Sequence, residues 1–389
     1  MRKIVAAFAG LVACFAFAAA ARAGTFQTLY AFQGLADGAA PYGKLVMDSV
    51  GVLYGVTVSG GTQGRGNIYS FDPATGLLTN LYSFTGGADG GNPQNGLALD
   101  GAGHLYGVTP RGGLTVNCSL GCGTVFKLTI ATQKLTTLYR FGGVADGSTP
   151  LGALTPLNGA LYGTTAYGGL GAGCPSQGCG TIFKYALAGK TFATMHTFVP
   201  ADGVDPQAKL VRAPSGLLYG TATSAGAFGS GTVFSVDPAS ATFSVVHNFD
   251  YHVDGSSSGA DLVVRNGLLF GTMTAGGPTA NGDGTVYRLD PATGVVTTLY
   301  SFTGQADGLF PTYGVAFGPT GRLYGTTDQG GTGSVGTMFQ LNPTTLAFAT
   351  VHTFTSAGGS FPASPPLVVG GAIYGVTSGN LGTIYKYVP

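Results

Sequence analysis

The chain has 389 residues, of which 44% are hydrophobic and only 8% are charged, and its formal net charge is +1. Intrinsic disorder requires low hydrophobicity and high net charge, so this composition excludes it. The balanced charge also argues against a nucleic acid or an acidic membrane surface as a partner, because no basic stripe is present to displace counterions. The 69 glycines are typical of many short strands joined by tight turns.

The first element in chain order is an apolar segment at the N-terminus. Two basic residues precede an alanine-rich run from residue 4 to residue 21, and the Ala-Arg-Ala that ends at residue 23 fits a signal-peptidase site. We therefore expect residues 1–23 to be a cleaved secretory signal, which would make the mature protein secreted or periplasmic with no membrane span. An uncleaved anchor and lipidation at Cys14 are the alternatives.

The rest of the chain is a tandem repeat marked by two short motifs, each present seven times. The triplet Leu-Tyr-Gly, or a close variant, recurs at steps of 52, 56, 57, 51, 54 and 50 residues, starting at Leu53, Leu105, Leu161, Leu218, Leu269, Leu323 and Ile373. Each is followed by Gly-Thr or Gly-Asn, an apolar residue and an aromatic, at Gly66, Gly123, Gly180, Gly231, Gly284, Gly336 and Gly382. Such self-similarity at about 50 residues indicates a repeat architecture.

A third motif, Tyr or His followed two residues later by Phe, is offset from the other two. Its first copy, Tyr30 and Phe32, precedes the first Leu-Tyr-Gly, and no copy follows the last Gly-Thr. Seven complete sets therefore exist only if the count wraps from the C-terminus to the N-terminus.

Each repeat is predicted to form four short strands rich in Val, Leu, Tyr, Phe and Thr. In the first repeat these are residues 44–48, 52–58, 67–72 and 78–84, and in the last only residues 366–369, 372–377 and 383–388 are available. The strand at residues 25–32 would complete the last sheet and remove an unpaired edge. We predict an all-β fold, a single seven-bladed β-propeller over residues 24–389.

The motifs Leu-Tyr-Gly-x-Thr, Gly-Thr-Val-Phe and Leu-Tyr-x-Phe, with Ala-Asp-Gly between repeats, resemble the bacterial tandem-repeat family of GloVer-type proteins. The resemblance covers nearly the whole mature chain. It implies an exported, propeller-like protein and no established activity. Relatives often carry a C-terminal sorting anchor, which is not expected here because the sequence ends at Pro389 directly after a predicted strand.

The loops between successive repeats carry an Asp-Gly pair in six of seven cases, at Asp37, Asp89, Asp146, Asp202, Asp254 and Asp307, with Ala357-Gly358 as the seventh copy. These loops and the loops after the second strands should share one face of the disc. The carboxylates are candidates for binding Ca²⁺ or a polar ligand. The alternative is that Asp-Gly is a tight turn without further function.

No catalytic constellation stands out. The chain contains no Glu, and most of its 16 Asp residues occupy repeated turn positions, so no carboxylate pair is singled out for glycosidase chemistry. His196, His247 and His352 stand where other repeats have Tyr, on separate blades. We expect no catalytic residues, no metal site and no cofactor.

Two loops depart from the repeat. The distance from the Gly of Leu-Tyr-Gly to the Gly of Gly-Thr is 11 residues in repeats 1, 4 and 6, but 16 in repeat 2 and 17 in repeat 3. These longer loops hold Cys118 and Cys122, and Cys174 and Cys179. In an exported protein we expect disulfides, with local pairing favoured over pairing between blades, and a zinc site as the rival.

A second departure lies nine residues before Leu-Tyr-Gly, where repeats 1 and 4 have Lys44 and Lys209 and repeats 2, 3 and 6 have Gly. These lysines could attract an anionic ligand near the centre of the disc, or they could be solvated side chains without a ligand.

From these patterns we expect a monomeric, non-catalytic binding or scaffold module whose ligand, a polysaccharide or another protein, contacts the loops at residues 112–123 and 168–180. A propeller lyase or hydrolase acting on extracellular carbohydrate is the second hypothesis, and a purely structural repeat protein is the third. The sequence names no ligand.

Overall fold

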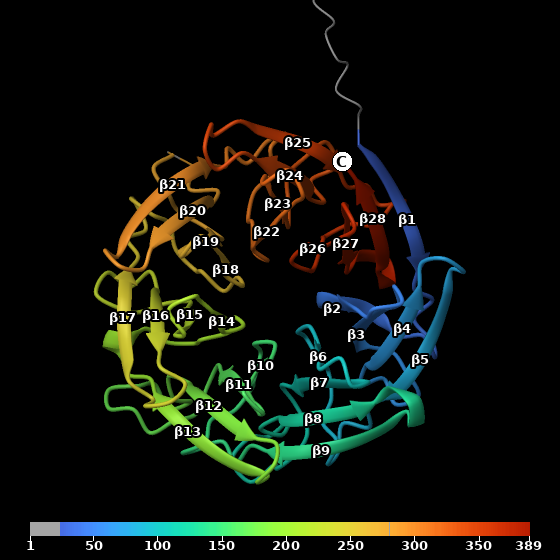
Figure 1. The fold of residues 1–389 in the computed structure, drawn as a ribbon, viewed down its shortest axis with the longest axis vertical. Coiled ribbons are helices and arrows are strands. Elements are labelled where there is room, and N and C mark those ends of the chain that lie inside the picture. Colours follow the sequence, from blue (N-terminus) through green and yellow to red (C-terminus); the bar gives the residue numbers. More distant parts are fainter. Residues whose placement is uncertain (1–23, 280) are drawn as a thin grey trace, which may run out of the picture.

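The computed structural model describes residues 24–279 and 281–389. These residues form seven four-stranded antiparallel sheets, arranged as blades around a common axis (Figure 1). The predicted signal peptide and Cys14 lie outside the described residues. The fold is the all-β, seven-bladed β-propeller predicted from the repeat.

Every blade has the same strand order from the axis outwards. The innermost strands are β2 (Ala39–Met47), β6 (Ala98–Leu99), β10 (Thr155–Leu157), β14 (Val211–Arg212), β18 (Val263–Arg265), β22 (Val315–Phe317) and β26 (Leu367–Val369). The second strands are β3 (Leu53–Ser59), β7 (His104–Thr109), β11 (Ala160–Thr165), β15 (Leu218–Ala222), β19 (Leu268–Met273), β23 (Leu323–Thr327) and β27 (Ala372–Thr377).

The outer half of each blade is built in the same way. The third strands are β4 (Asn67–Asp72), β8 (Thr124–Thr129), β12 (Thr181–Ala186), β16 (Thr232–Val236), β20 (Thr285–Asp290), β24 (Thr337–Leu341) and β28 (Thr383–Val388). The outermost strands are β5 (Leu77–Ser83), β9 (Lys134–Arg140), β13 (Thr191–Thr197), β17 (Phe243–Asn248), β21 (Val295–Ser301), β25 (Phe348–Thr353) and β1 (Thr25–Ala31). Within the described part of the chain, three short 3₁₀ helices lie in loops, at η1 (Ile130–Thr132), η2 (Pro200–Asp202) and η3 (Gly379–Leu381).

The last blade contains strands from both ends of the described chain. Strand β1 pairs antiparallel with β28, from Thr25 opposite Val388 to Ala31 opposite Thr383. Figure 1 shows the two strands side by side at the rim of the disc. The pairing hydrogen-bonds the outer edge of β28, so the ring closes as the offset third motif predicts.

The inner strand of the first blade is longer than predicted. We expected residues 44–48, whereas β2 begins at Ala39 because Ala39, Pro41 and Tyr42 also pair with β3. The register then shifts between Tyr42 and Val46, next to Gly43 at φ +75°. The additional pairing involves the segment that follows Asp-Gly, which the alternation of residue types did not reveal.

The glycine of Leu-Tyr-Gly is required by close packing inside each blade. Gly107 lies directly opposite Phe126 in the β7–β8 ladder. A Cβ on Gly107 would come within 2.5 Å of the Phe126 ring, and one on Gly163 would meet Phe183 at the same distance. The glycine of Leu-Tyr-Gly therefore lies opposite the aromatic residue that follows Gly-Thr. The absence of a side chain on the glycine leaves the space in which the aromatic ring is buried.

The phenylalanine of the third motif joins adjacent blades. Phe84, which follows the outer strand of the first blade, packs edge-to-face on Phe126 of the second, with 5.3 Å between ring centroids. Equivalent edge-to-face pairs, with centroids 5.1–5.3 Å apart, recur at each of the six remaining blade junctions. At the junction that closes the ring, the pair is Phe32 on Tyr69. Because these rings are buried, the motif is a packing signature, and its wrap across the termini reflects the closed ring.

Candidate ligand-binding site on the loop face

The loops after the second strands and the loops between blades meet on one face of the disc, called here the loop face. Backbone bridges join the two sets, for example Gly91 with Arg111 and Ser148 with Tyr167. This arrangement was predicted from the antiparallel order of the strands. It places both cysteine loops on the loop face, above adjacent blades.

Each cysteine loop is closed by its own disulfide. Cys118 is bonded to Cys122, and Cys174 is bonded to Cys179. These are the two local pairings favoured from the sequence, and they leave no free thiolate among the four for a zinc site. In both pairs the second cysteine is buried, so each bridge anchors an exposed loop to the protein interior. Short bridges of this kind restrict loop movement more than they stabilise the fold.

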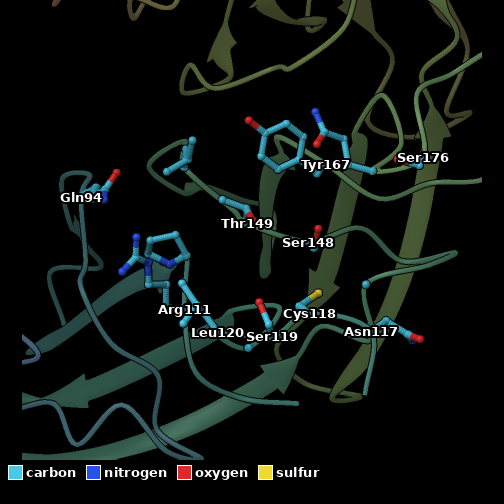
Figure 2. A pocket seen from close by; sticks show the side chains of 15 residues that line it. Gln94, Arg111, Asn117, Cys118, Ser119, Leu120, Ser148, Thr149, Tyr167 and Ser176 are labelled. Carbon is cyan, nitrogen blue, oxygen red and sulfur yellow. The ribbon is translucent and has the colours of Figure 1, made fainter. Parts of the chain in front are cut away.

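A pocket of about 560 Å³ opens on the loop face between the second and third blades. It is lined by the first cysteine loop, including Ser119 and Leu120, and by Ser176 and Gln177 of the second. Figure 2 shows Tyr167 on one side, facing Arg111 and Leu120, with Thr149 between them in this view. A smaller hollow of about 200 Å³ adjoins it, shares Arg111, and adds Arg65 and Asn92.

Arg111 and Tyr167 occupy the same position of the repeat, as the bridge partners of the inter-blade loops. Blades 4 and 5 have Ser224 and Ala275 there. Blade 6 has Gln329 at this position. The pocket thus lies between two successive blades that both have a large polar side chain there. Sequence reasoning missed both residues, although comparing this one position between repeats would have found them together with Gln329.

The pKa values of two ionisable groups, Tyr167 and Asp205 of the fourth blade, are raised. The negative charge of Asp205 raises the pKa of Tyr167, and burial acts in the same direction. Burial also raises the pKa of Asp205, although Gln207 Nε2 donates a hydrogen bond of 2.7 Å to its Oδ2. At neutral pH the pocket therefore presents a protonated phenol and a guanidinium as hydrogen-bond donors.

The six Asp-Gly carboxylates are engaged within their own turns. Asp146 Oδ2 accepts hydrogen bonds from the Tyr139 hydroxyl at 2.9 Å and from the Gly142 amide at 2.7 Å. Asp37, Asp89 and Asp307 likewise accept from a Tyr hydroxyl, and Asp202 and Asp254 are bonded to His196 and His247. The structure distributes these carboxylates over six blades and brings no two of them to one point. In the described residues no group of three or more His, Cys, Asp or Glu could hold a metal ion.

The seventh inter-blade turn lies one residue later than the sequence motif predicts. The structure places Gly358 and Gly359 there, since Gly359 has φ +106° and faces Thr377 and Thr383 as Gly90 faces Thr109 and Thr124. The alignment of Ala357-Gly358 with Asp-Gly was therefore wrong by one residue. His352, the third histidine in a Tyr position, has Gly358 instead of an aspartate at this turn, and burial lowers its pKa to about 4.

Lys44 and Lys209 lie at the inner ends of their blades, as predicted, and a third charged residue accompanies them. Each lysine is seven residues after an Asp-Gly aspartate, and Asp261 is seven residues after Asp254. Burial lowers the pKa of the Lys44 ammonium; Asp261 counteracts this effect and Lys209 adds to it. The Asp261 carboxylate accepts a 2.9 Å hydrogen bond from the Lys209 amide. Counting from Leu-Tyr-Gly missed Asp261, because the inner hairpin of the fifth blade is one residue shorter.

Comparisons with known proteins agree with this architecture. The Gloeobacter/Verrucomicrobia repeat model matches residues 10–174, 171–316 and 279–389. The chain belongs to this repeat family. No curated protein matches it. Membership explains the seven repeats and leaves the activity open.

Two solved structures illustrate the likeness in fold. Oligogalacturonate lyase in complex with manganese has a TM-score of 0.55 at 13% identity, covering 94% of this chain and 96% of that one. The extracellular domain of a hybrid two component system from B. thetaiotaomicron has a TM-score of 0.58 at 11% identity. That match covers 93% of this chain but only 39% of the larger protein. At such identities the likeness shows the fold alone.

No helix within the described residues is long and apolar enough to cross a membrane.

Proposed function

We propose that this propeller is an exported, non-catalytic binding module that holds a polysaccharide in the pocket between the second and third blades. The observation that carries the proposal is the coincidence of three departures from the repeat. The two lengthened loops, their two disulfides, and the pair Arg111 and Tyr167 all surround one pocket of about 560 Å³. That volume is in the range of small-molecule and cofactor sites.

The chemistry of the lining favours a sugar chain. Gln94, Ser119, Ser176 and Gln177 offer neutral donors and acceptors, and Tyr167 adds an aromatic ring with a polar tip. The pocket is open along the loop face and continues into the hollow at Arg65. An open, polar groove suits an extended ligand with many hydroxyl groups better than a compact apolar one. The disulfides anchor the loops and reduce the entropy lost on binding.

Export is supported by two independent features. Residues 1–23 have the composition of a secretory signal, and disulfides persist in oxidising compartments.

The test is binding of the purified protein to a glycan array. Shortening the loops at 112–123 and 168–180, or substituting Tyr167→Ala together with Arg111→Ala, should abolish the signal. A matched control shortens the loop at 220–231 of the fourth blade, which has no disulfide, and should leave binding intact. Binding that survives the first changes, or is lost equally in the control, would refute the assignment. If the purified protein binds no glycan but binds another protein through this pocket, the ligand is a protein and the proposal of a polysaccharide is wrong.

A further inference from the structure

The face opposite the loop face carries a second pocket, between the fifth and sixth blades. It has a volume of about 510 Å³ and is lined by the hairpin after β18 and the turn after β24. Two arginines, Arg265 and Arg288, contribute to it, together with Phe270 and Phe317. We call it the arginine pocket. It shares no residue with the pocket on the loop face.

Both guanidinium groups are held by the protein and remain without a carboxylate partner. The Arg265 guanidinium lies over the Phe317 ring, 4.5 Å from its centroid. Arg288 Nη2 donates a hydrogen bond of 3.5 Å to Thr297 Oγ1. Within residues 24–279 and 281–389, every ion pair shorter than 4 Å joins a histidine to an aspartate, so neither arginine is neutralised in this way. Two unpaired cations at one pocket favour an anionic ligand.

The equivalent hollow between the fourth and fifth blades is lined by a carboxylate instead of arginines. It has a similar volume, about 520 Å³, and is lined by Ala213, Tyr219 and Asp290 with no arginine. Asp290 begins the turn between the third and fourth strands, where Asp72 and Asp237 stand in two other blades. In the arginine pocket this position is Asn342. The blade that could place a carboxylate beside the two guanidinium groups therefore has a neutral amide instead.

The remaining lining residues are suited to sugar hydroxyls. Asn342 Oδ1 accepts hydrogen bonds from the amides of Thr344 and Thr345, at 2.9 and 3.1 Å, which leaves the side-chain NH₂ as a donor. Thr320 and Thr344 add hydroxyl groups at the rim. Phe270 and Phe317 meet edge-to-face at 5.0 Å between centroids and form an apolar wall. This combination resembles neither a bare phosphate site nor an apolar cavity.

We propose that the arginine pocket binds an acidic saccharide, with the guanidinium groups of Arg265 and Arg288 on its carboxylate groups and Asn342 and Thr320 on its hydroxyls. A guanidinium matches the planar carboxylate of a uronic acid through paired N–H donors. The site is independent of the polysaccharide site on the loop face, and the two can be lost separately.

The test is calorimetric titration with a β-1,4-linked glucuronic acid trimer, compared with cellotriose, which has the same backbone without carboxylates. The trimer should bind the wild-type protein and weaken as salt is added, since the contact is ionic. Arg265→Ala with Arg288→Ala should weaken binding by at least about tenfold. Asn342→Asp, which introduces the aspartate that three other blades have at this position, should weaken binding without removing an arginine.

The matched control is Lys184→Ala with Lys386→Ala. Those lysines also lie over aromatic rings, Tyr162 and Tyr374, on other blades, and their loss changes the net charge by the same amount. Trimer binding should persist in this control and in Tyr167→Ala, which separates the proposal from that for the loop face. Equal binding of cellotriose, equal binding of inorganic phosphate, or full affinity in both the double arginine variant and Asn342→Asp would overturn the proposal. Thermal unfolding of each variant establishes that it is folded, and Asn342→Asp tests the site even if the arginine variant does not fold.

Discussion

The ring of Phe26 lies flat on the ring of His352, with 3.6 Å between centroids and 5° between planes. Phe26 is in β1 and His352 is in the outermost strand of the sixth blade. The same stacking occurs between blades that are consecutive in the chain. The ring centroids of Phe192 and Tyr139 are 3.9 Å apart, and those of Phe348 and Tyr300 are 3.7 Å apart. The strand from the N-terminal side therefore makes the contact that an ordinary outermost strand makes with the preceding blade.

This equivalence predicts that the closing strand contributes as much stability as an internal one. Phe26→Ala should lower the free energy of unfolding by about 2 kcal/mol, because a half-buried ring is removed from between two aromatic neighbours. Phe192→Ala, at the equivalent internal position, should have a similar effect in chemical denaturation. A neutral Phe26→Ala beside a destabilising Phe192→Ala would show that the ring is not closed by β1 in solution.

The half-buried His352 predicts a loss of stability in mild acid. Burial lowers its pKa from 6.5 to about 4 in the folded protein, so between these values the unfolded chain binds more protons. The contribution is full above about pH 6.5 and is lost as the pH falls towards about 4. Since the ring is only half-buried, we expect an effect of about 1 kcal/mol.

The measurement is chemical denaturation of wild type and His352→Phe at about pH 7.5 and about pH 5. The variant should lose less stability between the two conditions. His252→Gln, at an exposed position in a loop, controls for the removal of a histidine. Identical pH dependence in wild type and His352→Phe would contradict the assignment.

The Asp-Gly carboxylates are predicted to stabilise the turns between blades. Asp146→Ala removes the acceptor for both the Tyr139 hydroxyl and the Gly142 amide, and should lower the free energy of unfolding by about 2 kcal/mol. Tyr139→Phe removes one of these bonds and should cost about half as much. Ca²⁺ should not change the melting temperature if the carboxylates serve the turns; a calcium-dependent increase that Asp146→Ala abolishes would support a binding role instead.

The two disulfides are predicted to matter more for the pocket than for the fold. Replacing Cys118 and Cys122 by Ser should lower the free energy of unfolding by about 2 kcal/mol, because the bridge closes a very short loop. The same change should weaken glycan binding markedly if the loop must be held in place. Thiol titration of the unfolded, unreduced protein should detect no free thiol from the four loop cysteines; a reactive thiol there would exclude at least one of the two bridges.

Much of the architecture follows from the sequence because the repeat is written in local chemistry. Each repeat contains a glycine opposite a buried ring, as in Gly107 and Phe126, and an aromatic residue at the blade junction. The spacing of these residues in the sequence therefore defines the strands of each sheet. The wrap of the third motif determined how the ring closes. The separation of the cysteines within each loop was short enough to favour the two local disulfides.

The sites were decided only by the tertiary structure. Arg111 and Tyr167 are 56 residues apart in the chain, and Arg265 lies in a different blade from Asn342, so no local motif contains either set. They meet because neighbouring blades pack at a fixed angle and bring equivalent repeat positions side by side. A one-residue difference in hairpin length hid Asp261, and a one-residue shift hid Gly359, since each such change alters which side chain reaches a given place. The repeated residues determine the propeller fold. The residues that differ between repeats form pockets only when the blades are packed together.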